Sequence, residues 1–277
     1  YKQFAAECMA IAAWTAEQSR QAGHTVHVGL MGSSSHHYLA VLLGVMSAGC
    51  VAVPLDIQVN LDTFCDCLTR SDVDVLFYDW EHRPLVDGAM ERCPGIRTYI
   101  SLQHGRHVPC SDNILKEYAG RSVHPDIDIN ALAMILFTSG TTGRGKGVML
   151  SQGNLIDNVF CTDEPDIYCN QIFLNVLPIH HVFCINGDVL LTMRYGNTLC
   201  LNLDMSKLVE HMRLFEPTRF RTVPMIPKSL YNRIMMLSRQ YPDKPLEEIK
   251  NEVLGSRLNR IACGGGYLAP ELKECYA

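Results

Sequence analysis

The sequence has 277 residues, 47% of them hydrophobic, which is enough to bury a large core in one big or two ordinary domains. Its formal net charge of -5 at pH 7 excludes the basic field that nucleic-acid binding requires, so we expect no nucleic-acid partner. The twelve cysteines are scattered, with Cys65 and Cys67 as the one close pair, and no Cys/His set has zinc spacing. We interpret them as buried thiols in a reducing cytosol.

An uncharged stretch of 18 residues runs from Tyr38 to Leu55, which reaches the lower length limit of a membrane span. Gly44, Gly49 and Pro54 interrupt this stretch, so it divides into a helix and a buried strand. We therefore predict a core element here and no transmembrane segment. The sequence shows no signal peptide and starts without methionine, which indicates a fragment of a longer cytoplasmic protein.

Apolar strand patterns alternate with amphipathic helical patterns along the whole chain. Such alternation predicts an α/β fold, with layered βαβ subdomains and largely parallel sheets that helices cover. A polar, weakly periodic stretch at 104–128 is the predicted connecting region. The predicted strands are 26–31, 50–53, 73–78, 98–102, 132–137, 172–176, 198–201, 220–223 and 260–263, and the predicted helices are 4–22, 38–47, 61–70, 152–161, 182–194, 205–215, 228–239 and 246–254.

A loop of hydroxyl-bearing residues and glycines follows the strand predicted at 132–137. From Leu136 to Gly147 the sequence reads Leu-Phe-Thr-Ser-Gly-Thr-Thr-Gly-Arg-Gly-Lys-Gly. Glycines let successive backbone N–H groups converge on an anion, hydroxyls add donors or a metal ligand, and Lys146 supplies a mobile positive charge. This composition predicts a site for a polyphosphate with its magnesium ion.

Two kinds of phosphate loop fit this pattern. Gly140, Gly145 and Lys146 match most of the P-loop NTPase motif, which continues with Ser or Thr for magnesium and then with a helix. Here Gly147 follows the lysine, and residues 148–151 predict a short strand ahead of the next helix. The loop instead resembles the signature loop of the AMP-forming adenylating enzymes, which include acyl-CoA synthetases, peptide-synthetase adenylation domains and luciferases. That family usually has proline at the position of Gly145, so we expect a more mobile loop here.

Three further segments resemble the same family and follow its order along the chain. Residues 47–56 resemble a structural segment that closes a helix and positions a strand. Residues 174–183 resemble a segment in which the histidine three positions after the proline, here His181, lies beside the acyl pocket. Residues 261–272 resemble a glycine turn that packs on adenine, with Tyr267 in place of the usual proline. Within the family, residues 177–201 and 205–227 look most like bacterial long-chain fatty acyl-CoA synthetases.

The resemblance implies that residues 1–277 form part of a large N-terminal AMP-binding domain and that the intact protein works in two steps. A carboxylic acid, expected to be a fatty acid, reacts with ATP to form an acyl-adenylate and pyrophosphate, and CoA then displaces AMP. By the same resemblance Thr138 is the magnesium ligand, Lys146 and His181 are the catalytic candidates, and Val182, Phe183 and Ile185 line the acyl tunnel or form a plain helix core. The other nucleotide-binding candidates are Ser139, Gly140, Thr141, Thr142, Gly143, Gly264, Gly265 and Gly266.

The sequence ends at Ala277, before the family's magnesium-binding glutamate, ribose-binding aspartate and small mobile C-terminal domain with its lysine. We therefore expect residues 1–277 alone not to complete adenylation. Three alternatives stay open: a P-loop kinase or ATPase, a non-catalytic module of the same fold, and an amino-acid adenylation domain. In the last, Asp188 either holds the substrate ammonium or faces solvent. The exact acid, the thiol acceptor and the oligomeric state are not indicated by the sequence.

Overall fold

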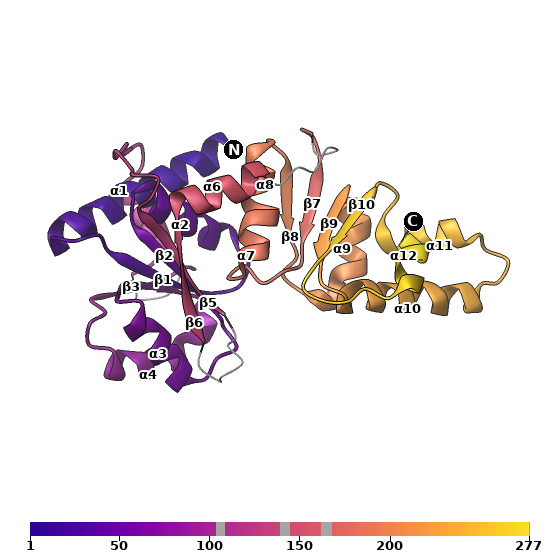
Figure 1. Cartoon of the computed structure of the whole chain (residues 1–277), viewed down its shortest axis with the longest axis horizontal. Helices are drawn as coiled ribbons and strands as arrows, with labels where there is room; N and C mark the ends of the chain where they lie inside the picture. The colour runs from indigo at the N-terminus through magenta and orange to yellow at the C-terminus, as the bar shows by residue number, and fades with distance from the viewer. Residues whose placement is uncertain (104–108, 139–144, 162–167, 277) are drawn as a thin grey trace. The chain divides into compact units, whose positions relative to one another are not determined.

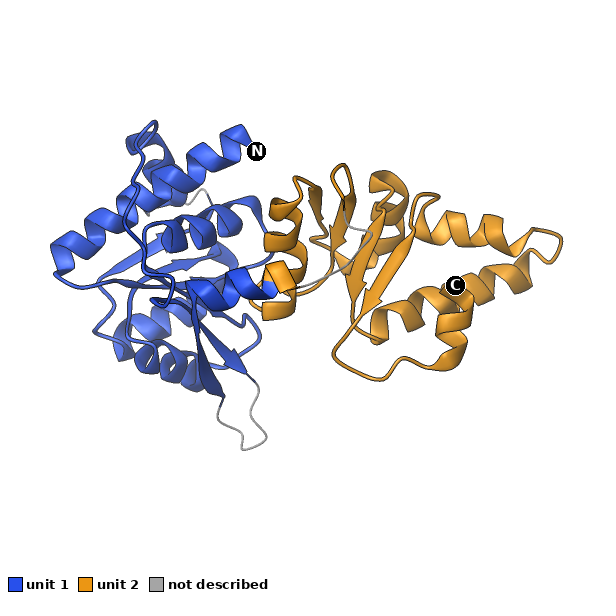
Figure 2. Cartoon of the chain, turned by 45° about the horizontal axis from the view of Figure 1, so that its top comes forward, with its two compact units in different colours: residues 1–158 blue, residues 159–277 orange. Residues whose placement is uncertain are grey.

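The structure is a computed structural model that describes residues 1–103, 109–138, 145–161 and 168–276 (Figure 1). The chain divides into two compact units, Tyr1–Asn158 and Val159–Ala277, and each has its own sheet (Figure 2). Both sheets consist mainly of parallel strands that helices cover, which confirms the predicted α/β class.

The first unit is built on a six-stranded sheet with the order β4-β3-β1-β2-β5-β6. Neighbouring strands in this sheet are parallel except for β5 and β6, which are antiparallel. Because helices cover both faces of the parallel part, its central strands are buried along nearly their whole length rather than at alternate residues. The strands are β1 (His27–Met31), β2 (Val51–Leu55), β3 (Val73–Tyr78), β4 (Thr98–Ser101), β5 (Leu132–Thr138) and β6 (Lys146–Ser151).

Helices cover both faces of this sheet because the chain steps from β1 to β2 and then returns across β1 to β3. Right-handed crossovers in opposite directions place the connecting helices on opposite faces. Figure 1 shows α1 and α2 on one face and α3 and α4 on the other. The helices of this unit are α1 (Lys2–Ala22), α2 (His36–Ser47), α3 (Leu61–Arg70), η1 (Trp80–His82), α4 (Arg83–Arg92), α5 (Ser111–Glu117) and α6 (Gln152–Cys161), the last of which runs into the second unit.

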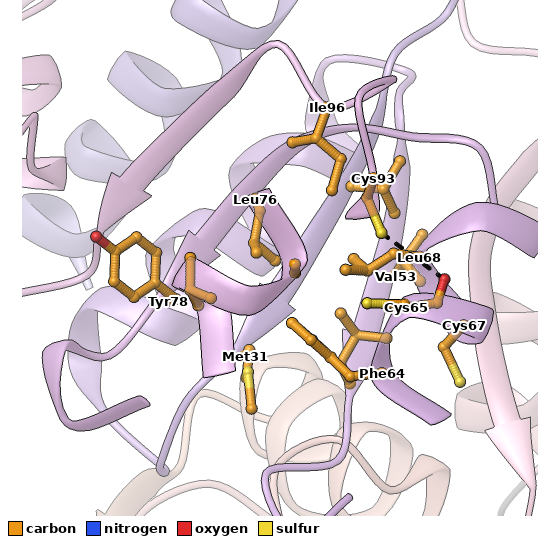
Figure 3. Packing of buried hydrophobic residues seen from close by; sticks show 14 of the residues in the cluster. Met31, Val53, Phe64, Cys65, Cys67, Leu68, Leu76, Tyr78, Cys93 and Ile96 are labelled. Atoms are coloured by element: carbon orange, nitrogen blue, oxygen red, sulfur yellow. Dashed lines mark hydrogen bonds between the residues drawn. The ribbon is translucent and has the colours of Figure 1, made fainter. Parts of the chain in front are cut away.

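One core of the first unit lies between the sheet and α3. Phe64 and Leu68 of α3 are almost fully buried, and they belong to the same cluster as Val53 and Leu76 of the sheet (Figure 3). The uncharged stretch from 38 to 55 forms α2 and β2, as predicted. No helix in the described part of the chain is long and apolar enough to cross a membrane.

The second unit is built on a four-stranded parallel sheet with the order β10-β9-β7-β8. Successive residues of β7 face opposite sides, so Leu174 packs with α9, α10 and α11 while Phe173 packs with Leu191 of α8. Its strands are β7 (Ile172–Asn175), β8 (Thr198–Leu201), β9 (Arg219–Thr222) and β10 (Arg260–Cys263). Its helices are α7 (Val182–Cys184), η2 (Ile185–Leu190), α8 (Leu191–Arg194), η3 (Met205–Lys207), α9 (Leu208–Phe215), α10 (Met225–Gln240), α11 (Leu246–Leu254) and α12 (Pro270–Tyr276).

The predicted connecting region at 104–128 lies between β4 and β5 within the first unit, and residues 111–117 of it form the helix α5, which was not predicted. The division between the units falls at Asn158 and Val159, whereas α5 lies inside this segment and buries Ile114 in the first unit. Tyr118, just after α5, donates a hydrogen bond of 2.8 Å from its hydroxyl to Glu17 of α1. A helix of seven residues has too few turns to show a clear apolar period, so its polar composition was misleading.

The close contact between α1 and α2 generates a stability prediction at Gly44. A Cβ atom at this position would lie 2.7 Å from Cβ of Ile11 and 2.8 Å from the carbonyl oxygen of Cys8. We expect Gly44→Ala to lower the free energy of unfolding by about 1–3 kcal/mol, although alanine favours helices, because the two helices must move apart. Urea titration measures this change. Gly95→Ala is the matched control, since a Cβ there meets nothing within 4 Å, and unchanged stability of Gly44→Ala would contradict the close packing.

Candidate functional site

Two candidate residues face each other at the base of the phosphate loop. Thr138 ends β5 and Lys146 begins β6, and the antiparallel register pairs them directly. The Thr138 hydroxyl lies 3.5 Å from the Lys146 carbonyl oxygen, to which it donates, and both residues are exposed. The remaining loop candidates, Ser139, Gly140, Thr141, Thr142 and Gly143, lie outside the described residues.

The strand that follows Lys146 decides between the two kinds of phosphate loop. In a P-loop NTPase a Ser or Thr and then a helix follow the lysine, whereas here Lys146 opens β6, antiparallel to β5. A Cβ atom on Gly147 would lie 3.3 Å from Cγ2 of Ile135 and 3.5 Å from Cε1 of Phe137. A hydroxyl-bearing side chain would therefore be crowded at this position. The geometry excludes the P-loop kinase or ATPase arrangement.

The space around position 145 leaves no room for a side chain. A Cβ atom at this position would lie 2.9 Å from the backbone carbonyl oxygen of Thr138. Real Cβ atoms do not come this close to a carbonyl oxygen, so any side chain would push the two ends of the loop apart. The absence of a side chain at 145 thus lets the chain return close to Thr138 before it enters β6.

In the second unit, the other candidates gather at the carboxyl end of the sheet. From β7 the chain passes to β8 on one side, and from β9 it passes to β10 on the other side. In open parallel sheets such a reversal opens a crevice at the carboxyl ends of the two strands, where ligands commonly bind. His181 follows β7 and the glycine turn at 264–266 follows β10, so both lie at this end of the sheet.

Phe183 brings the histidine segment and the glycine turn into contact. A Cβ atom on Gly264 would lie 3.3 Å from Cε1 of Phe183, so the phenyl ring rests against bare backbone. The Gly264 amide donates a 3.0 Å hydrogen bond to the carbonyl oxygen of Thr222, and Gly265 adopts a φ of 76°, which favours glycine. The turn is therefore a flat backbone surface beside the aromatic ring.

His181 stands at the N-terminus of α7 with an exposed side chain. Its backbone amide donates to the Pro178 carbonyl oxygen at 3.0 Å, and its ring centroid lies 4.7 Å from that of His180. Of the apolar candidates beside it, Val182 and Phe183 are 43% and 36% exposed, but Ile185 is fully buried. Ile185 therefore belongs to the helix core and does not line an open tunnel.

A buried polar cluster that the sequence did not reveal lies beneath this end of the sheet. The Asn175 side-chain amide donates to Oδ2 of Asp188 at 3.0 Å, and Nη1 of Arg221 lies 4.0 Å from Oδ1 of Asp188. Arg221 also donates to the Gly187 carbonyl oxygen, and a Cβ on Gly187 would lie 3.0 Å from Cδ of Arg221. The glycine thus makes room for the arginine.

Asp188 lies in a π-helical segment, Ile185–Leu190, within the helix predicted at 182–194. Its side chain is only 1% exposed, so the alternative in which it faces solvent was wrong. Burial raises the pKa of Asp188 from 3.8 to about 7, although the hydrogen bond from Asn175 and the charge of Arg221 both lower it. The extra residue in a π turn rotates the side chains that follow it, and this rotation cannot be predicted from the sequence pattern.

The described residues contain no group of three or more His, Cys, Asp or Glu side chains that could hold a metal ion. Magnesium, however, is commonly bound through one or two protein oxygens together with substrate phosphates and water. The exposed Thr138 hydroxyl fits that kind of site, in which the nucleotide supplies most of the ligands.

Comparisons with known proteins cover the whole chain. The family model described as AMP-binding enzyme matches residues 1–277. A 4-coumarate–CoA ligase-like 8 from Arabidopsis thaliana is 29% identical over 162 residues, which cover 57% of this chain and 27% of the relative. The peroxisomal OPC-8:0-CoA ligase 1 from the same plant is 24% identical over 270 residues, 92% of this chain and 45% of the relative. A long-chain-fatty-acid–CoA ligase 5 from Mus musculus is 25% identical over 261 residues, 86% of this chain and 37% of the relative.

Among solved structures, the A-PCP didomain of carboxylic acid reductase from Segniliparus rugosus, in complex with AMP, superimposes with a TM-score of 0.86. It is 21% identical and the match covers 99% of this chain and 44% of that one, a likeness that shows the fold. The chain thus spans less than half the length of each of these proteins.

The buried Asp188 generates a pH prediction. Because its folded-state pKa of about 7 lies above the ordinary 3.8, the folded chain keeps a proton that the unfolded chain has released at pH 5 to 7. The stability contributed by this group is therefore full at low pH and is lost as pH rises through 7, by about 1.4 kcal/mol per unit between about pH 5 and 7. Asp188→Asn cannot ionise and should lack this slope.

Urea unfolding at several pH values gives the free energy of unfolding of the wild type and of Asp188→Asn. The difference between the two proteins isolates Asp188, because all other titrating groups are the same in both. Asp204→Asn is the matched control in the same unit. Hydrogen bonds from Ser206 lower the pKa of Asp204 below 3.8, so its replacement should not change the slope above pH 5. Parallel stability curves for wild type and Asp188→Asn would contradict the prediction.

Proposed function

Because the chain belongs to the AMP-binding enzyme family, we propose that the protein containing it activates a carboxylic acid with ATP. The carboxylate attacks the α-phosphorus of ATP, pyrophosphate leaves, and an acyl-adenylate forms. The thiol of CoA then attacks the acyl carbon, so that a thioester forms and AMP leaves. The observation that carries the proposal is the pairing of Thr138 with Lys146 at the base of a glycine- and hydroxyl-rich loop that joins two antiparallel strands.

In the first unit, Lys146 is proposed to offset the negative charge of the phosphates during the first step. Its exposed side chain at the base of the loop supports this role. Thr138 is proposed to supply one oxygen ligand to a magnesium ion whose other ligands come from phosphates and water. When bound, that ion neutralises charge on the pyrophosphate leaving group. The backbone and hydroxyls of residues 139–143 are proposed to cradle the phosphates.

In the second unit, the glycine turn at 264–266 is proposed to bind the adenine ring. A flat ring can lie against backbone that lacks Cβ atoms, and the contact between Gly264 and Phe183 is an example of such packing within the chain itself. His181 is proposed to lie beside the acid because it is exposed at the same end of the sheet. The exposed Val182 and Phe183 then offer apolar surface to an acyl chain.

A fatty acid is the proposed substrate, on the resemblance of residues 177–201 and 205–227 to bacterial long-chain fatty acyl-CoA synthetases. The burial of Asp188 speaks against an amino acid as substrate. An amino-acid adenylation domain normally directs a carboxylate at the substrate ammonium, whereas Asp188 is 1% exposed and accepts a hydrogen bond from Asn175. Among the described residues no disulfide is formed, and such free thiols support a cytoplasmic location for the proposed enzyme.

The test of this proposal is acid-dependent exchange of labelled pyrophosphate into ATP by the full-length protein, with a panel of fatty, aromatic and amino acids. We expect exchange with fatty acids and, because a phosphate-binding charge is lost, a decrease of about 100-fold in Lys146→Ala. Lys116→Ala, another exposed lysine of the first unit, is the matched control and should retain full activity. Residues 1–277 expressed alone are expected not to support exchange.

Each outcome of this assay discriminates among the open functions. If only aromatic or amino acids support exchange, the proposed adenylation reaction stands but the substrate is not a fatty acid. ATP binding without exchange for any acid would contradict the enzyme proposal and favour a non-catalytic module of the same fold.

A further inference from the structure

Arg70, the last residue of α3, reaches the base of the phosphate loop from a position far away in the sequence. Its Nη1 donates a 2.7 Å hydrogen bond to the Gly145 carbonyl oxygen, and its guanidinium carbon lies 5.5 Å from the ring centroid of Phe137. These two partners belong to the two stems of the loop, since Phe137 precedes Thr138 and Gly145 precedes Lys146. The arginine therefore bridges both stems.

We propose that Arg70 is a positioning residue that holds Thr138 and Lys146 in place for the nucleotide. The inference rests on the proposed function, because it assigns to Arg70 an effect on ATP use that acts through the loop. Among the described residues, Arg70 contacts the loop at its two stems, so its role is to hold the stems in place and not to take part in the reaction.

The helix that carries Arg70 is firmly anchored. The Asn60 side chain caps α3 by accepting a 2.9 Å hydrogen bond from the Thr63 amide, and Phe64 and Leu68 are almost fully buried in the core. Nη1 of Arg70 also donates to Oδ2 of Asp66 at 3.0 Å, one helical turn earlier. The hydrogen bond to Asp66 restricts the guanidinium to the region near the loop. Less side-chain entropy is therefore lost when Arg70 bridges the two stems.

Phe137 extends the bridge into the second stem. Its ring lies below the Arg70 guanidinium within the distance of a cation–π contact. A Cβ atom on Gly147 would lie only 3.5 Å from Cε1 of the same ring, so the ring packs against the bare backbone of β6. A stack of Arg70, Phe137 and Gly147 therefore joins α3, β5 and β6 beside the loop.

The loop has a physical need for such a restraint. Glycine at 145 allows the 2.9 Å approach to the Thr138 carbonyl oxygen, but it also leaves the backbone more freedom than any other residue would. A charged donor makes a stronger hydrogen bond to a carbonyl oxygen than a neutral one does. The hydrogen bond from Arg70 therefore restricts the backbone at Gly145, the residue of the stems with the greatest conformational freedom.

Three variants of the full-length protein test this proposal. Arg70→Ala removes the bridge, and Arg70→Lys keeps the charge but lacks the planar guanidinium that lies over the Phe137 ring. Arg83→Ala is the matched control on the next helix. Arg83 also pairs with an aspartate four residues away, Asp87, and lies 5.5 Å from an aromatic ring centroid, that of Trp80. In the described part of the chain its hydrogen bonds go to Asp87 and Tyr78 and not to the loop stems.

Two measurements are made on each variant. Hydrogen exchange of peptides that contain β5 and β6, without nucleotide, reports the order of the stems whether or not the enzyme is active. Pyrophosphate exchange reports kcat/KM for ATP and KM for the acid. We expect Arg70→Ala to exchange amide hydrogens faster in these peptides and to lower kcat/KM for ATP by about 5- to 20-fold, as for a lost charge-assisted hydrogen bond on a part-exposed side chain. KM for the acid should not change.

Arg70→Lys should give intermediate values in both measurements, and Arg83→Ala should match the wild type. Unchanged hydrogen exchange in Arg70→Ala would overturn the proposal, as would equal losses in Arg83→Ala. Recovery of kcat/KM in Arg70→Lys without recovery of amide protection would also overturn it, because the arginine would then act through its charge alone. A wild type that shows no acid-dependent exchange would contradict the proposed function, while hydrogen exchange would still decide whether Arg70 orders the stems.

Discussion

The burial of both faces of a parallel sheet is the constraint on which this structure depends. Parallel strands need crossover connections, and helices supply them while covering the apolar faces. All loops after the strands of such a sheet therefore meet at one edge, and in the second unit this edge brings His181 near the glycine turn through Phe183. Among the strands that the structure describes, β5 and β6 alone pair antiparallel, and the phosphate loop joins these two strands.

Inside the second unit, three buried polar side chains, Asn175, Asp188 and Arg221, contact one another. Asn175 ends β7, Arg221 comes from β9, and Asp188 reaches them from a π-helical turn. Removing one member would leave a buried charge or amide without its partner, which costs more than the pair contributes. The cluster therefore favours one arrangement of β7, β9 and the helix, and so fixes the surface from which His181 and Phe183 project.

Much of the fold could be predicted from the sequence because its strands are short apolar runs with clear ends. The loop from Leu136 to Gly147 was recognisable since its residue types and spacing form a local pattern. The short helix α5 was missed because seven residues carry little periodicity, and Arg70 was missed because its partners lie 67 and 75 positions away in the sequence. Asp188 could not be placed, since a π turn changes the direction of its side chain without any sequence signal.

The close approach of Gly145 to Thr138 has a consequence for which substitutions the loop tolerates. Any residue with a Cβ at 145 first requires the two stems to separate, because the carbonyl oxygen of Thr138 occupies the space. Because Arg70 donates to the carbonyl oxygen of the same residue, a substitution at 145 that moves the backbone also changes the contact that Arg70 makes. The effects of substitutions at positions 70 and 145 are therefore expected not to add.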